Sequence, residues 1–341
     1  MGAKPVVVGV DGSEDSLLAV EWAAMEARRH GLPLRIVSAP AMLPPMHPYP
    51  ATPPTVSGVL REASVRALEM GVGRAEEVAP GLEISADLLS GPPALAVADC
   101  GSSAAMLVVG ARGAGGFAAM VLGSVGRYAA IRAACPVIVA RLSSMAVHQE
   151  VAIGVRDPQD TSAALTFAFE EAAARHADLV VVHAWYWFPS ALRAPAQAGD
   201  ALQAPFHPEQ ISAEAATGLS AALDGWREKY PDVPVRCDVI HGHPARVLAN
   251  YSARADLVVI GRHGSGIGSI QHVLLDHARG PVAVIPCCDL RCRWLTRGSR
   301  PRGSGRPDRP RSRTPDLSGG GCWPNSAGHS SSSWSPPEAA R

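Results

Sequence analysis

Lysine, aromatic residues and long apolar runs are all scarce in this chain of 341 residues. Aromatic residues make up 5% of it, while Val, Ala and Leu dominate, as is typical of parallel strands that helices bury on both faces. No run approaches the roughly 18 apolar residues of a membrane helix, and "MGAKPVVVGVDGS" contains no apolar stretch of signal-peptide length. We therefore expect no membrane contact and a cytoplasmic protein.

The cysteines lack the regular spacing of a disulfide framework, so reduced thiols are the simplest interpretation. Cys287, Cys288 and Cys292 are a weak candidate metal cluster at the start of an irregular tail. The pair His241 and His243 has no nearby third ligand, which favours a loop between a strand and a helix. We predict no metal site in the protein itself.

Acidic residues outnumber basic residues over most of the chain, whereas basic residues outnumber acidic residues at its end. Residues 289–341 carry ten Arg against four acids, whereas residues 1–288 carry 21 basic and 27 acidic groups. The net negative charge of residues 1–288 therefore argues against binding of a polyanion by this part of the chain. The tail mixes Arg with Pro, Ser and Gly and has no hydrophobic periodicity, so we expect it to be disordered. It is either a weak nucleic-acid-binding segment, which is the less favoured option, or GC-rich DNA translated out of frame.

The chain is duplicated. "VVVGVDGS" at 6–13 returns as "VAIGVRDP" at 151–158, and "CPVIVAR" at 135–141 returns as "GPVAVIP" at 280–286. The offset between the copies is 145 residues from Gly9 to Gly154 and 151 residues from Gly110 to Gly261. It is 145 again at the last strand, so the second copy loses six residues inside its glycine-rich loop.

Each copy alternates short apolar runs with helical segments. In the first copy we predict strands at 6–10, 34–37, 83–89, 105–110 and 136–140, and helices at 14–30, 59–78, 93–102 and 124–134. This order predicts an α/β fold of two doubly wound, Rossmann-like, open parallel five-stranded sheets in tandem. The domains are expected at 1–147 and 148–288, followed by the disordered tail at 289–341.

Two segments of the first copy end strands with residues suited to ligand binding, because ligands of open parallel sheets bind at the carboxyl ends of the strands. In Gly9-Val10-Asp11-Gly12-Ser13, Ser13 is expected to cap the next helix, while Asp11 faces the crevice, where it could bond a ribose or a base. The purely structural alternative is a helix-capping turn, which explains Ser13 but does not explain an acid at position 11.

The second segment is a glycine pattern, in which Gly110 and Gly113 are followed after nine residues by Gly123 and Ser124. Backbone N–H groups of such a turn, together with a helix N-terminus, favour phosphate, and a Cβ would hold the backbone away from its oxygens. A Walker A loop is excluded, because neither lysine follows a glycine. The apparent dinucleotide fingerprint at 113–118 is discounted, because it follows a late strand and no acid follows it before Glu150.

Together with Asp11 and the closing "CPVIVAR" strand, this glycine pattern resembles the universal stress protein family, and the duplication resembles its tandem form. The resemblance covers about residues 4–286. It implies ATP, alone or with Mg²⁺, as the bound adenine nucleotide, with backbone near Val37 at the adenine. It also implies a homodimer through the edge strands at 137–140 and 282–285. The contacts it implies in the first domain are Gly9, Asp11, Ser13, Val37, Gly110, Arg112, Gly113, Gly123, Ser124 and Val125.

The second domain departs from the pattern. Arg156 stands where Asp11 would be expected, Asp157 comes one residue late, and three residues instead of nine separate Gly264 from Gly268. We predict that the first domain binds the nucleotide and that the second site is weakened or altered. Its corresponding contacts would be Gly154, Gly261, Gly264, Gly268 and Ser269.

Three functions remain open at the level of the sequence. The leading hypothesis is a non-enzymatic, ATP-binding protein of stress response or signalling, because residues 110–141 contain no general base apart from the thiol of Cys135. The second is slow ATP hydrolysis or nucleotidyl transfer through Asp11 and Mg²⁺. The third is a dimerising scaffold that binds no nucleotide.

The prolines at 40–54 and the aromatic cluster at 185–188 are expected in loops after the second strands, as lids, partner surfaces or simple loop packing.

Overall fold

The computed structural model describes residues 3–41, 54–113, 122–141, 147–157, 161–186, 208–262 and 268–286. The predicted tail, Cys287, Cys288, Cys292, most of the proline-rich segment and residues 187–188 of the aromatic cluster lie outside these ranges. Among the described residues, no helix has the length and apolar character needed to cross a membrane.

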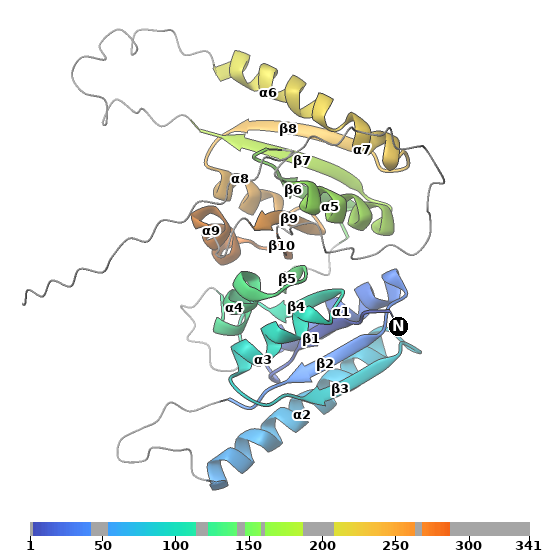
Figure 1. The fold of residues 1–341 in the computed structure, drawn as a ribbon, viewed down its shortest axis with the longest axis vertical. Helices are drawn as coiled ribbons and strands as arrows, with labels where there is room; N and C mark the ends of the chain where they lie inside the picture. The colour runs from blue at the N-terminus through green and yellow to red at the C-terminus, as the bar shows by residue number, and fades with distance from the viewer. Residues whose placement is uncertain are drawn as a thin grey trace, which may run out of the picture. The chain divides into compact units, whose positions relative to one another are not determined.

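The first repeat alternates strands and helices as its sequence predicts (Figure 1). Its elements are β1 (Val6–Gly9), α1 (Glu14–His30), β2 (Leu34–Ser38), α2 (Pro54–Val78), β3 (Ile84–Leu88), α3 (Pro93–Asp99), a 3₁₀ turn η1 (Cys100–Ser102), β4 (Met106–Gly110), α4 (Ser124–Arg132) and β5 (Val137–Ala140). All strand pairs inside this repeat are parallel.

The second repeat follows the same order with one additional short helix. Its elements are β6 (Glu150–Gly154), α5 (Ser162–Arg175), β7 (Asp178–Trp185), α6 (Pro208–Ala222), α7 (Asp224–Lys229), β8 (Val235–His241), α8 (Pro244–Tyr251), β9 (Leu257–Arg262), α9 (Ser269–His277) and β10 (Val282–Pro286). Trp185, which was predicted in a loop, ends β7 instead, and the loop between β8 and α8 holds Gly242 and His243 as expected.

Helix α1 shows why the sequence places these elements so sharply. The Ser13 side chain accepts a hydrogen bond from the N–H of Ser16 at the start of the helix, and Glu14 and Asp15 follow in the first turn. Gly31 ends the helix with a φ of 61°, a left-handed conformation that glycine adopts without strain. The sequence therefore marks both the start and the end of this helix, and the helix has the predicted bounds.

The strands divide the core into two layers. Alternate β1 and β4 residues such as Val8 and Val108 pack with α1 and α2, while Val7 and Leu107 pack on the other side with α3 and α4. The second repeat continues both layers with α5 and α6 on one face and α8 and α9 on the other. Residues on both faces are buried, which explains the continuous apolar strands of the sequence.

The edge strands differ from the prediction in their pairing partner. We expected β5 and β10 to pair between two chains, but they pair with each other, antiparallel, with Val282 opposite Val139. The two five-stranded sheets are thereby joined in the order β3-β2-β1-β4-β5-β10-β9-β6-β7-β8. Since these edges are already occupied, they are not available for the homodimer contact that the sequence suggested.

Candidate functional site

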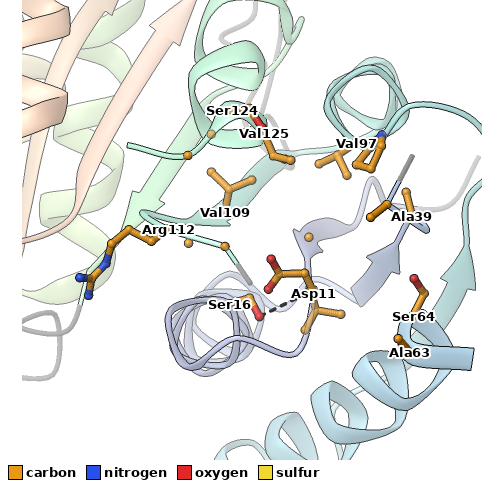
Figure 2. Close-up of a pocket in the computed structure, with 18 of the residues that line it drawn as sticks. Asp11, Ser16, Ala39, Ala63, Ser64, Val97, Val109, Arg112, Ser124 and Val125 are labelled. Carbon is orange, nitrogen blue, oxygen red and sulfur yellow. Dashed lines mark hydrogen bonds between the residues drawn. The ribbon is translucent and has the colours of Figure 1, made fainter. Parts of the chain in front are cut away.

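A cavity of about 460 Å³ opens at the carboxyl ends of β1 and β4 (Figure 2). Its volume lies within the usual range of small-molecule sites, about 300–1,000 Å³. The crevice lies where the strand order reverses between β1 and β4, the place where open α/β sheets bind their ligands. Lining residues come from both strands, from the segment after β2, and from helices α1 to α4.

Gly110 ends β4 and packs against the first turn of α1. A Cβ built on Gly110 would lie 2.7 Å from the carbonyl oxygen of Asp15 and 3.0 Å from the backbone nitrogen of Ser16. Neither backbone atom can move away without shifting the helix. Glycine is therefore required here by the packing of β4 on α1, whether or not a ligand also approaches this backbone.

Gly113 lies opposite the predicted carboxylate. A Cβ on Gly113 would lie 2.6 Å from Oδ2 of Asp11, so the absence of a side chain leaves room for the Asp11 side chain itself. Asp11 is exposed and lines the cavity, and Figure 2 shows its carboxylate directed toward the strand ends. Ser13 donates to Asp11 Oδ1 from its N–H at 3.0 Å and from its hydroxyl at 2.6 Å.

The N-terminus of α4 forms the opposite wall. Gly123 caps this helix without a side-chain hydrogen bond, and Ser124, the first helical residue, is exposed. Both line the cavity together with Val125 and Gly126. The first N–H groups of a helix lack partners within it and carry partial positive charge, so this wall suits an anion.

Arg112 lies at the cavity with its guanidinium turned aside. Its Nε donates to Oδ2 of Asp15 at 2.9 Å and its Nη2 to Oδ1 at 3.2 Å, and its backbone N–H also donates to Oδ2. This hydrogen bonding raises the pKa of Arg112 above its usual value. In Figure 2 the guanidinium points away from the cavity. Asp15, buried in the first turn of α1, was not predicted as a site residue.

Val37 does not line the cavity. Its side chain is buried in β2, and its carbonyl oxygen accepts a hydrogen bond from the N–H of Val10 at 2.8 Å. The lining residues from this part of the chain are Ala39 and Ala41. Gly9, predicted as a contact, does line it.

Helices α2 and α3 add lining residues that sequence reasoning missed: Leu60, Ala63, Ser64, Pro93 and Val97. No motif marks these residues, because they reach the cavity through tertiary packing. The only clue was the position of their helices after strands of the same sheet.

Two positions of the second domain that correspond to cavity-lining positions carry larger side chains, Leu248 in place of Val97 and Gln271 in place of Gly126. A Cβ on Gly154 would lie 2.7 Å from Cδ1 of Leu248. Gln271 corresponds to Gly126 at the offset of 145 and donates from its side-chain amide to the carbonyl oxygen of Gly261 at 3.1 Å. Gly268 caps α9 and Ser269 begins it, while Gly264 lies outside the described residues.

Arg156 and Asp157, which follow β6, are both exposed. The backbone carbonyl of Asp157 accepts a hydrogen bond from the Thr161 hydroxyl at 2.5 Å.

Glu26, His30 and Glu171 form a buried cluster with the geometry of a possible metal site. Arg175 already occupies it, because its guanidinium bonds to the carboxylates of both Glu26 and Glu171. His30 lies 3.1 Å from Glu171 and 3.5 Å from Glu26. Arg29 also pairs with Glu26, so two acids face three basic side chains and this cluster is an internal ion-pair network between α1 and α5.

The electrostatics of the network agree with that interpretation. Burial lowers the pKa of His30, but its hydrogen bonds to Glu171 and Glu26 outweigh burial and raise that pKa to about 9. Burial raises the pKa of Glu171, yet Arg175 and His30 bring it down to about 2. His30 and Glu171 are therefore both charged at neutral pH.

Fold and cavity together define a tandem, doubly wound α/β protein with an open cavity at the strand ends of its first repeat. The model of the "Universal stress protein family" matches residues 2–141 and 148–286. Universal stress protein Mb2028c of Mycobacterium bovis is 35% identical over 297 residues, covering 82% of this chain and 96% of its own. The chain belongs to the universal stress protein family.

Solved structures agree with the fold. A universal stress protein from Archaeoglobus fulgidus has a TM-score of 0.61 at 15% identity, covering 84% of this chain and 98% of its own. A universal stress protein solved in complex with cAMP is 26% identical, covering 41% of this chain and 99% of its own, with a TM-score of 0.32. The family model and the Archaeoglobus fulgidus structure with a TM-score of 0.61 confirm the predicted family and fold class.

Proposed function

We propose that the chain binds one adenine nucleotide, ATP, in the cavity of its first domain. The observation that carries this proposal is the pairing of a helix N-terminus that no side chain caps with a single carboxylate across a cavity of about 460 Å³. Asp11 is the only acid among the described lining residues. The phosphates would lie at Gly123 and Ser124, where backbone N–H groups and the Ser124 hydroxyl can donate to them.

The rest of the nucleotide would lie between Asp11 and the apolar walls. Ribose hydroxyls can donate to the Asp11 carboxylate, whose Oδ1 is held by Ser13. The adenine ring would pack against Ala39, Leu60 and Val97, which give the cavity its apolar side. Mg²⁺ bound with the nucleotide would be held chiefly by the phosphate oxygens, because Asp11, the one carboxylate of the described lining, lies at the ribose.

Binding without rapid turnover is the activity that these residues favour. No carboxylate or imidazole of the described lining residues lies on the α4 side of the cavity, where a water attacking the terminal phosphate would need activation. The ligand would thus act as a signal in a cytoplasmic stress response. The competing hypothesis is slow hydrolysis through Asp11 and Mg²⁺, and it predicts phosphate release that is lost in Asp11→Ala while nucleotide binding persists.

A cavity-filling variant tests the binding site directly. Ala63 lines the cavity from an exposed position on α2, so Ala63→Phe should obstruct it with little effect on the core. Isothermal titration of the full chain should give one ATP site per chain, weakened by about tenfold or more in Ala63→Phe. Ala221→Phe, at an exposed alanine of α6, is the matched control. Equal affinity in wild type and Ala63→Phe would reject this location.

A homodimer remains part of the proposal, through a surface other than β5 and β10. These two strands pair inside the chain, so dimerisation would use other elements. Sedimentation velocity with and without ATP measures the assembly state. A monomer under both conditions would remove the dimer from the proposal and leave the nucleotide site untouched.

A further inference from the structure

Arg262 of the second domain holds the C-terminus of α4 in the first domain. Its Nη1 donates to the carbonyl oxygens of Ala130, at 3.3 Å, and of Ile131, and its Nη2 donates to that of Ala133 at 3.1 Å. The last carbonyls of a helix have no partner within it and carry partial negative charge. One guanidinium thus provides both hydrogen bonds and a favourable charge at this helix end.

Helix α4 is the element whose other end faces the cavity. Its nine residues run from Ser124, on the cavity wall, to Arg132, beside the carbonyls that Arg262 holds. Near its start, Arg127 donates to Asp276 of α9 at 3.3 Å and lies 3.2 Å from Nδ1 of His272. Contacts with the second domain therefore fix α4 on both sides of its midpoint.

The duplication shows how this contact arose. At the offset of 151 residues, Arg262 corresponds to Ala111, which directly follows Gly110 in the glycine pattern. In the first domain the carbonyl oxygen of Ala111 accepts the N–H of Gly123 at 2.8 Å and so supports the local site. The second copy has arginine at this position, and its side chain reaches the helix of the neighbouring domain instead.

We infer that Arg262 is a positioning residue for the phosphate end of the first-domain site. The inference rests on the proposed function. The second domain then contributes to nucleotide binding without holding a nucleotide, because it orients the helix whose N–H groups meet the phosphates. Adenosine, which has no phosphate, should depend little on this orientation.

The test compares ATP with adenosine by isothermal titration of the full chain. Arg262→Ala should weaken ATP binding by about threefold to tenfold, the range expected when a charged helix-end contact is lost, and leave adenosine affinity within about twofold. Arg262→Lys keeps the charge but not the forked geometry, so an intermediate ATP affinity is expected.

If the alanine variant does not fold, the lysine variant alone should show the selective loss of ATP affinity. Arg236→Ala, at a half-exposed ion pair with Glu150 and Asp238, is the control and should change neither affinity.

The outcomes separate this inference from the proposed function. Selective loss of ATP affinity supports the positioning role. Equal losses for ATP and adenosine, or no change in the Arg262 variants while wild type binds ATP, would overturn the role of Arg262 alone. A wild-type chain that binds neither ligand would overturn the proposed function and this inference with it.

Discussion

Replacing His30 by glutamine should remove a pH-dependent contribution to stability that the ion network between α1 and α5 provides. The His30 side chain is 8% exposed and lies against two buried carboxylates, Glu26 and Glu171. Its pKa rises from 6.5 to about 9 in the folded chain. A group with a raised folded-state pKa stabilises the fold fully below its unfolded pKa, and this contribution disappears as pH rises through the folded pKa.

The size of the effect follows from the shift. One pKa unit corresponds to about 1.4 kcal/mol, so the protonated His30 contributes on the order of 3 kcal/mol at pH 6 that is gone by about pH 10. Glu171 acts in the opposite direction, since its pKa is lowered to about 2. Its contribution is lost only as pH falls toward that value, so it does not vary over the alkaline range.

Urea unfolding between pH 6 and pH 10 measures this difference. The free energy of unfolding of wild type minus that of His30→Gln should fall by about 3 kcal/mol across the range, with unchanged urea dependence. His277→Gln, at an exposed histidine that ends α9, is the control for histidine replacement. If wild type and His30→Gln lose stability in parallel from pH 6.5 to 9.5, the proposed charge state of the network is refuted.

Three glycines that line the cavity, Gly110, Gly113 and Gly123, should respond differently to replacement by alanine. Gly110→Ala places a Cβ 2.7 Å from the Asp15 carbonyl oxygen and should lower the free energy of unfolding by about 2 kcal/mol, whereas Gly123→Ala, with 3.6 Å to its nearest atom, should lower it far less in the same urea titration. Gly113→Ala meets the carboxylate of Asp11, the end of an exposed side chain, at 2.6 Å and should weaken ATP binding in calorimetry at nearly unchanged stability. A Gly113→Ala variant that unfolds as readily as Gly110→Ala would contradict this distinction.

The sequence predicted the elements well where local chemistry marks their ends. Helix α1 has its predicted bounds because Ser13 caps it and Gly31 stops it. Helix α2 begins at Pro54, five residues before the predicted start, because proline is tolerated in a first helical turn. The proline-rich composition had been assigned entirely to a loop, since composition alone does not distinguish the two.

The sequence predicted where the cavity lies, but only partly why particular residues stand at its wall. Spacing located Gly110 correctly at the cavity, but the partner that requires glycine there is the backbone of α1, which only the packing reveals. Arg112 was expected to contact the ligand, yet the unpredicted Asp15 holds its guanidinium. Both differences arise from α1, whose first turn approaches β4 more closely than any sequence motif indicates.

The two copies differ at positions that line the cavity of the first domain. Ala41 and Gly126, which leave the first cavity open, correspond at the offset of 145 to Tyr186 and Gln271. Larger side chains at ligand-facing positions are tolerated only where no ligand must enter, so these replacements are consistent with a single nucleotide per chain. Arg262 shows that the same divergence also created a new role, because it replaces a small residue of the glycine pattern and holds α4 of the other copy. Under the proposed function, the second domain binds no nucleotide itself and supports the site of the first, and both properties follow from the divergence of the two copies.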